Sequence, residues 1–266
     1  KMEKQKMKEL NQQRLNFFTY ISHEFKTPLS IILASIEEVF ENHQFSEEVN
    51  KHIQRLKRSA NRLSFLITQL MDFRKIETRH AKLILHKGDL VRFVYDTCLV
   101  FSPILEKKDI QFHFNSNKDK SINWFDPDKI EKIVTNLLSN AIKFTPEKGI
   151  IRCEIIIESR GRAKTSETLQ IKVSDTGIGI KEENMKDLFT QFNKTNDGEE
   201  SRIGTGLGLS LVKSLVEFLH GDINVHSIHG KGTSITVHIP LEIKKAPNVK
   251  LEKEQISPNR FINLDH

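Results

Sequence analysis

No stretch of this 266-residue sequence stays apolar for the roughly 18–20 residues that a membrane-spanning helix needs, and no signal peptide is visible. Cysteine is scarce, since Cys98 and Cys153 are the two present and they form no CxxC pair. A zinc site or a disulfide scaffold is therefore not predicted, because both need a recognisable cysteine spacing. We expect two buried, reduced thiols in a protein from a reducing compartment.

The net charge is +6, and positive charge forms no more than mild clusters, at the start of the chain (Lys1, Lys4, Lys6, Lys8) and near its end (Lys244, Lys245). The lysines are otherwise spread along the chain, without zinc-finger spacing or a basic stripe with interleaved aromatic residues. We therefore expect a solvated basic surface and no nucleic-acid partner. The sequence begins with Lys1 and not with methionine, so we expect a piece of a longer polypeptide.

Two long helical patterns occupy the N-terminal part of the chain. Apolar residues recur at steps of three and four in residues 7–40 and again in residues 49–73. The polar stretch 41–48 separates them, and Ser46 is a candidate N-cap for the second helix. The pattern predicts an antiparallel helical hairpin. Because a lone hairpin leaves an apolar face uncovered, we expect a homodimeric four-helix bundle; packing onto the rest of the chain is the alternative.

The rest of the chain has a mixed pattern of helices and strands. Asp89 is a candidate cap for a helix that extends to Ile104, and Asp126 with Pro127 opens a helix that extends to Phe144. Further elements are a helix at 208–219, a polar hairpin loop at 159–167, and strands at 110–114, 150–157, 169–174, 222–227 and 233–239. The predicted fold class is an all-α helical hairpin (1–80), then an α+β sandwich (81–243), then a polar tail or linker (244–266).

Three polar residues share one narrow stripe of the helix that ends at Phe144. Asn136, Asn140 and Lys143 are spaced i, i+4, i+7, and the stripe lies at the border between the apolar face and solvent. Asparagine is a poor helix former, so two of them there suggest a function. Their amide oxygens suit Mg²⁺, and a lysine suits phosphate; a merely polar helix edge is the alternative.

Two glycine motifs follow. "DTGIGI" begins at Asp175 after a predicted strand, and its glycines, Gly177 and Gly179, permit a close backbone approach. "GTGLGLSL" at 204–211 opens a helix, and backbone N–H groups at such a start can bind an anion. The largely polar segment between the motifs predicts a mobile lid over a ligand.

The ordered set of these motifs, with "LFTQF" at 188–192, resembles the N, F and glycine boxes of the GHKL ATP-binding fold. The resemblance implies that ATP and Mg²⁺ bind in a sandwich pocket, with Asp175 at the adenine amine and Asn140 as the magnesium ligand. Asn136 and Lys143 would contact the phosphates, and Thr233 would support the adenine site. The cofactor-binding residues that it implies are Asn136, Asn140, Lys143, Asp175, Gly177, Gly179, Phe192, Gly204, Thr205, Gly206, Leu207, Gly208, Leu209 and Thr233.

The segment "FFTYISHEFKTPLSII", residues 17–32, lies inside the first predicted helix. Helical spacing puts the imidazole of His23 on the face away from the apolar residues. Pro28 has no N–H to donate to the carbonyl of Glu24, so the helix should bend there. The segment closely resembles the H box of two-component sensor histidine kinases of the HisKA class. That resemblance implies that His23 accepts the phosphoryl group, Glu24 takes up the imidazole proton, and Thr27 assists dephosphorylation of the partner.

The resemblance covers about residues 10 to 241 and implies a protein-histidine kinase. ATP would phosphorylate His23, and an aspartate of a response-regulator receiver domain, separate or downstream in the parent chain, would then take the phosphoryl group. The family places such a chain in the cytoplasmic portion of a membrane-anchored sensor. Two alternatives are a GHKL ATPase that drives dimer closure, as in chaperones or mismatch repair, and a nucleotide-binding scaffold. Neither alternative has a use for the H box.

Overall fold

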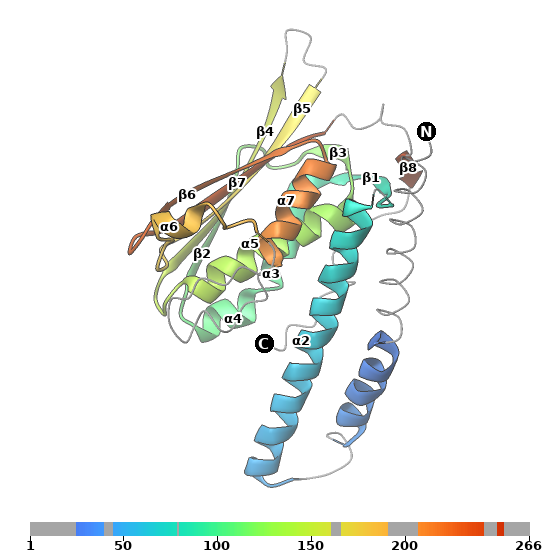
Figure 1. Ribbon diagram of the computed structural model, residues 1–266. Helices are drawn as coiled ribbons and strands as arrows, with labels where there is room; N and C mark the ends of the chain where they lie inside the picture. The colour runs from blue at the N-terminus through green and yellow to red at the C-terminus, as the bar shows by residue number, and fades with distance from the viewer. Residues whose placement is uncertain are drawn as a thin grey trace. The chain divides into compact units, whose positions relative to one another are not determined.

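A computed structural model describes residues 25–39, 45–78, 80–160, 166–190, 207–241 and 249–252, with the backbone alone at 160, 166 and 249–252. The chain divides into two compact units between Ala81 and Lys82. In its described residues the first unit is helical, and the second contains two sheets and the helices that pack on them (Figure 1).

The first unit contains a helix over residues 25–39 and the long helix α2 (Glu47–Glu77). The N-cap of α2 is confirmed, because the side chain of Ser46 accepts a hydrogen bond from a backbone N–H of the first turn at 3.4 Å. An ion pair of 3.3 Å between Lys57 and Glu37 joins the two helices. The antiparallel hairpin predicted from the apolar periodicity is therefore present in the residues that the structure describes.

Several large apolar side chains of this unit are exposed in a single copy of the chain. They are Phe25, Ile31, Ile32, Val39, Val49, Leu56, Leu63 and Phe65. Leu29 and Ala60, in contrast, are buried. The outward direction of His23 and the part of the first helix before residue 25 lie outside the described residues. The bend expected at Pro28 stays a prediction.

A five-stranded sheet, in the order β2-β4-β5-β7-β6, forms the core of the second unit (Figure 1). Its strands are β2 (Gln111–Ser116), β4 (Ile150–Arg160), β5 (Ser166–Asp175), β6 (Asp222–Ile228) and β7 (Gly232–Pro240). β2 and β4 run parallel and the other neighbours antiparallel. Alternate residues are buried along the central strands, as Ile151, Cys153 and Ile155 show, which is the period that predicted them.

The hairpin predicted around 159–167 is confirmed, because β4 and β5 pair antiparallel, but the predicted ends of its loop, Ser159 and Glu167, are wrong. Ser159 pairs with Glu167 and Arg160 with Ser166, so the two strands continue into both ends of that stretch. Residues 161–165 lie outside the described residues. Polar side chains are compatible with a strand that projects beyond the helices, because neither of its faces must be apolar there. Composition alone therefore placed the strand ends too early.

Three helices cover one face of the large sheet: α3 (Leu90–Leu99), α5 (Pro127–Phe144) and α7 (Gly208–Phe218) (Figure 1). The start of α5 is confirmed, because Asp126 accepts a hydrogen bond from the backbone N–H of Lys129 at 3.2 Å and Pro127 occupies the first turn. The core face of α5 includes Ile133 and Leu137, which are 0% and 1% exposed. The predicted sandwich of helices on a mixed sheet is confirmed.

The single helix predicted from Asp89 to Ile104 is two helices. α3 ends at Leu99, and α4 spans Ser102–Lys107. Pro103 accounts for the break, because it has no N–H to donate to the carbonyl of Leu99. Asp89 does cap α3, as predicted.

A second, three-stranded sheet has the order β3-β1-β8 and was not predicted. Its strands are β1 (Leu83–Asp89), β3 (Ile122–Phe125) and β8 (Val249–Glu252). Asp126 accepts a hydrogen bond of 2.8 Å from the backbone N–H of Ile84, which anchors the start of α5 on this sheet. β8 lies in the stretch predicted as a polar tail or linker, and it pairs in parallel with β1. These residues form a strand because they pair with the open edge of β1, and no local sequence pattern predicts that pairing.

Candidate nucleotide-binding site

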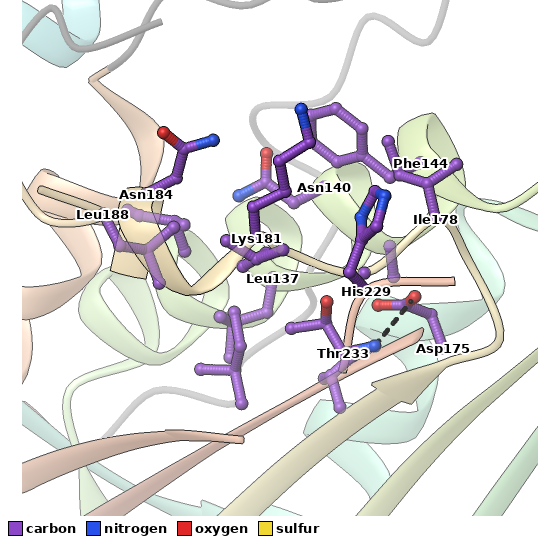
Figure 2. A pocket seen from close by; sticks show the side chains of 16 residues that line it. Leu137, Asn140, Phe144, Asp175, Ile178, Lys181, Asn184, Leu188, His229 and Thr233 are labelled. Carbon is purple, nitrogen blue, oxygen red and sulfur yellow. Dashed lines mark hydrogen bonds between the residues drawn. The ribbon is translucent and has the colours of Figure 1, made fainter. Parts of the chain in front are cut away.

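A pocket opens in the second unit where the end of β5 and the start of β7 face α5 (Figure 2). It contains about 910 Å³ of unfilled space, part of which is open solvent. Its walls come from α5, β5 and the turn after it, the short helix α6 (Glu182–Met185), the start of α7, the β6–β7 turn and β7 itself. Polar residues that line it include Asn140, Asp175, Lys181, Asn184, His229 and Thr233. Segments far apart in the sequence therefore meet at one cavity.

The carboxyl group of Asp175, the last residue of β5, is held by two backbone N–H groups. Gly177 donates to Oδ1 at 2.8 Å. Thr233 donates to the same oxygen at 3.2 Å (Figure 2). No described residue donates a hydrogen bond to Oδ2. Burial raises the pKa of Asp175, and the N–H groups of Gly177 and Thr233 partly offset this effect. The arrangement leaves one oriented acceptor for a ligand in the pocket.

The β6–β7 turn packs closely on the turn that follows Asp175. Gly230 donates its backbone N–H to the carbonyl of Ile178 at 2.7 Å. Gly179 has a φ of +66°, and a Cβ there would collide with the carbonyl oxygen of Ile228. Glycine alone tolerates both conditions. The close approach predicted for the glycines of "DTGIGI" is thus present, with backbone as the neighbour.

The polar stripe of α5 is divided between two environments. Asn140 lines the pocket. Asn136 is 8% exposed and does not line the pocket. Its Nδ2 donates a hydrogen bond to the carbonyl of Lys132, one turn earlier, at 2.7 Å, and its Oδ1 faces Gly208 at the start of α7. The Nζ of Lys143 lies 4.2 Å from the centroid of the Phe144 ring. Of the three stripe residues, Asn140 is the one that reaches the cavity wall.

The start of α7 is the described part of the second glycine motif. Leu207 precedes the helix, Gly208 is its first residue, and Leu209 lines the pocket. A Cβ at Gly208 would lie 3.0 Å from Oδ1 of Asn136, so a small residue lets the two helices approach. Backbone N–H groups at this end of α7 are suited to an anion. The other predicted residues, Phe192, Gly204, Thr205 and Gly206, and most of the expected lid lie outside the described residues.

The H box is described only in part. Thr27 is an exposed residue of the helix over residues 25–39, whereas His23 and Glu24 lie outside the described residues. In the part of the chain that the structure describes, no helix combines the length and apolar character needed to cross a membrane.

Comparison with known families decides the identity of both units. Residues 13–79 match the His Kinase A (phospho-acceptor) domain. Residues 125–243 match the histidine kinase-, DNA gyrase B- and HSP90-like ATPase family. The chain belongs to the histidine kinases. Its second unit thus carries the nucleotide-binding ATPase domain of that family, and the pocket of Asp175 lies within the matched residues.

Individual relatives agree with this assignment. Histidine kinase P4 of Formosa agariphila is 34% identical over 244 residues, which are 90% of this chain and 17% of the relative. The chain spans between 17% and 24% of the length of the first three curated relatives that it matches. Among solved structures, full-length ShkA in complex with AMPPNP has a TM-score of 0.69 at 23% identity, over 84% of this chain and 45% of ShkA. Histidine kinase ThkA in complex with the response regulator TrrA has a TM-score of 0.59 at 20% identity, over 91% and 67%. The two structures share the fold of this histidine kinase.

Several lining residues of the histidine kinase pocket were missed by sequence reasoning. Lys181 and Asn184 follow "DTGIGI" directly, in a stretch that was assigned to a lid. His229 belongs to the turn "HGKG", which was interpreted only as a hairpin connection. Their nearness to the glycine motif and to Thr233 was the available signal, because residues beside a site in sequence often share its wall.

Proposed function

We propose that this chain is the catalytic core of a two-component sensor histidine kinase. Residues 1–80 form the dimerisation and phosphotransfer domain, 81–243 the ATP-binding domain, and 244–266 a tail or linker. ATP phosphorylates His23, and an aspartate of a response-regulator receiver domain then takes the phosphoryl group. The observation that carries the proposal is the pocket in which an oriented carboxylate and an asparagine of α5 line one cavity. AMPPNP in ShkA and the response regulator bound to ThkA support it.

The pocket suits an adenine nucleotide. The Oδ2 of Asp175 is placed to accept a hydrogen bond from an exocyclic amine, which adenine provides. Apolar lining residues, among them Leu188 and Ile235, can cover the faces of a base. Positive charge for the phosphates would come from Lys143 and from the N-terminal end of α7.

The donor set also suits Mg²⁺. Asn140 supplies an amide oxygen at the wall, which is the ligand type that this ion prefers. The described residues hold no cluster of three or more His, Cys, Asp or Glu side chains for a metal ion, so phosphate oxygens and water would complete the coordination. When bound, Mg²⁺ neutralises charge on the phosphates.

Phosphorylation of His23 is a nucleophilic substitution at phosphorus. A ring nitrogen of the neutral imidazole forms the N–P bond, the bond from the γ-phosphorus to ADP breaks, and Glu24 takes the proton from the other ring nitrogen. Because this transition state needs mainly positioning and charge neutralisation, the two domains must bring the pocket to the histidine. Thr27, one turn after His23, is exposed and is placed to help water attack the phosphorylated partner.

The helical domain is proposed to form a homodimer. Exposed side chains such as Ile32, Leu56 and Leu63, between 49% and 59% exposed in one copy, would be covered by the second hairpin of a four-helix bundle. The family further places this chain in the cytoplasmic portion of a membrane-anchored sensor. Light scattering on this chain tests the first point, and fractionation of the full-length protein tests the second.

The decisive experiment is incubation with γ-labelled ATP and Mg²⁺, followed by acid and alkali treatment of the labelled protein. A phosphohistidine is labile in acid and stable in alkali. We expect wild-type label with this behaviour and none in His23→Gln. His52→Gln is the matched control, because His52 is an exposed histidine of the same helical hairpin and should keep full labelling. Steady phosphate release without protein label would instead favour the ATPase alternative.

A further inference from the structure

Ser227, near the end of β6, has a hydroxyl group with three polar neighbours. The backbone N–H of Ile180 donates to its Oγ at 2.8 Å. The same Oγ donates to the carbonyl of Gly232 at 3.0 Å and lies 2.9 Å from Oγ1 of Thr233. Ser227 therefore connects the turn after β5, the β6–β7 turn and a side chain that lines the pocket.

The proton on each hydroxyl follows from these neighbours. A hydroxyl has one proton to donate and two lone pairs to accept with. The N–H of Ile180 must donate and the carbonyl of Gly232 must accept, so they use one lone pair and the one proton of Ser227. All three contacts are satisfied only if Thr233 donates its own proton to the remaining lone pair of Ser227.

The direction of the Thr233 proton determines which hydrogen-bonding groups the pocket presents to a ligand. Because its proton is committed to Ser227, Thr233 can offer only lone pairs to a ligand. Asp175, whose Oδ1 accepts the backbone N–H of Thr233 at 3.2 Å, also offers only an acceptor when ionised. Both side chains line the cavity, and they lie close together in Figure 2. This end of the pocket is thus lined with acceptors, which match an amine and repel a carbonyl oxygen.

We propose that Ser227 is a positioning residue for base selection: it directs the Thr233 proton away from the pocket, so that the site takes an adenine nucleotide and rejects 6-oxopurine nucleotides. The inference rests on the proposed function of the same site. Inosine triphosphate is the informative competitor, because it has a carbonyl oxygen where ATP has the 6-amino group. With the Ser227 hydroxyl removed, Thr233 regains a free proton and can donate it to that oxygen.

The test measures dissociation constants of ATP and inosine triphosphate by calorimetry, with KM and kcat of autophosphorylation for both. In Ser227→Ala we expect the preference for ATP to shrink about tenfold, since a lost or gained hydrogen bond has roughly that effect. The change should appear in KM and not in kcat. A merely structural role would weaken both nucleotides equally, and an unchanged ratio overturns the proposal.

Two further variants sharpen the test. Ser174→Ala is the matched control, because Ser174 also makes a hydroxyl contact between β5 and β7, 3.0 Å to Ser234, but does not line the pocket. Its ATP preference should equal that of the wild type. Thr233→Val should itself reduce the preference, and adding Ser227→Ala to it should change nothing more. Thr233→Val keeps the proposal falsifiable if Ser227→Ala does not fold, since a wild-type ratio there overturns it.

The inference and the proposed function fail in different ways. Wild-type protein that binds no ATP overturns the proposed function and the inference with it. Wild-type protein that binds ATP and labels His23, with the same nucleotide ratio in Ser227→Ala, overturns only the role of Ser227.

Discussion

Glu131 allows a quantitative prediction about stability and pH. This residue of α5 is 7% exposed, and its Oε1 has no hydrogen-bond partner among the described residues. Burial raises the pKa of Glu131 to about 7; repulsion from Asp128 adds to this, and attraction to Lys132 partly offsets it. The folded protein therefore keeps the carboxyl group of Glu131 protonated up to a higher pH than that of an ordinary glutamate.

The magnitude follows from the change in pKa. A rise from the ordinary value of 4.5 to about 7 corresponds to about 3 kcal/mol, at about 1.4 kcal/mol for each tenfold change in proton affinity. Because the folded state binds this proton more tightly than the unfolded state, its contribution to stability is complete below pH 4.5. It is lost as the pH rises through about 7.

Glu131→Gln keeps the size of the side chain and removes its ionisation. We expect the variant to be more stable than the wild type by less than about 1 kcal/mol at pH 5 and by about 3 kcal/mol at pH 8. Urea denaturation followed by tryptophan fluorescence measures this, because the single tryptophan of the chain, Trp124, lies in β3 of the same unit.

The control is Glu147→Gln, since Glu147 is an exposed glutamate of the same unit. Its free energy of unfolding should stay within about 0.5 kcal/mol of the wild type at each pH. A Glu131→Gln variant with no pH-dependent gain between pH 5 and pH 8 would show that the carboxylate is solvated in the folded protein, and the reasoning would be refuted.

Three more predictions follow from single side chains. Asp126→Ala should lower the free energy of unfolding, measured by urea denaturation, by about 3 kcal/mol, because it removes the cap of α5 and leaves the backbone N–H of Ile84 without its acceptor. Asp126→Asn retains a cap and should lower it less. Gly179→Ala should weaken ATP binding at least tenfold in calorimetry, since its φ of +66° and the carbonyl of Ile228 both exclude a Cβ; wild-type affinity would contradict this. Asn140→Asp should abolish His23 labelling while light scattering still finds a dimer; a monomer would mean that the substitution acts through folding.

Local chemistry in the sequence predicted many elements correctly. Ser46 and Asp126 cap their helices because a short polar side chain satisfies backbone N–H groups within its own turn. Alternating apolar residues predicted β4 and β7 because side chains of a strand point to opposite faces. The glycine motif at Asp175 was visible because close backbone contact demands a residue without Cβ. Each of these signals is contained in a few consecutive residues.

The limits of local patterns appear at β8 and at the polar stripe of α5. β8 is a strand because β1 offers an edge for pairing. The stripe predicted one environment for Asn136 and Asn140, yet the start of α7 covers Asn136 and leaves Asn140 at the cavity. Helical spacing gives the direction of a side chain, and only the neighbouring element decides what it meets.

The sequence by itself determined that this protein has a histidine-bearing helical hairpin and a nucleotide-binding sandwich, since caps, periodicities and glycine motifs act over short distances. The tertiary structure decided which groups meet in the pocket. Asp175 and Thr233 are 58 residues apart, and the register of β5 with β7 makes them partners. The direction of the Thr233 proton depends on Ser227, Ile180 and Gly232 together. Such a network forms only when separate strands and turns are packed, because each group has its partner in another segment.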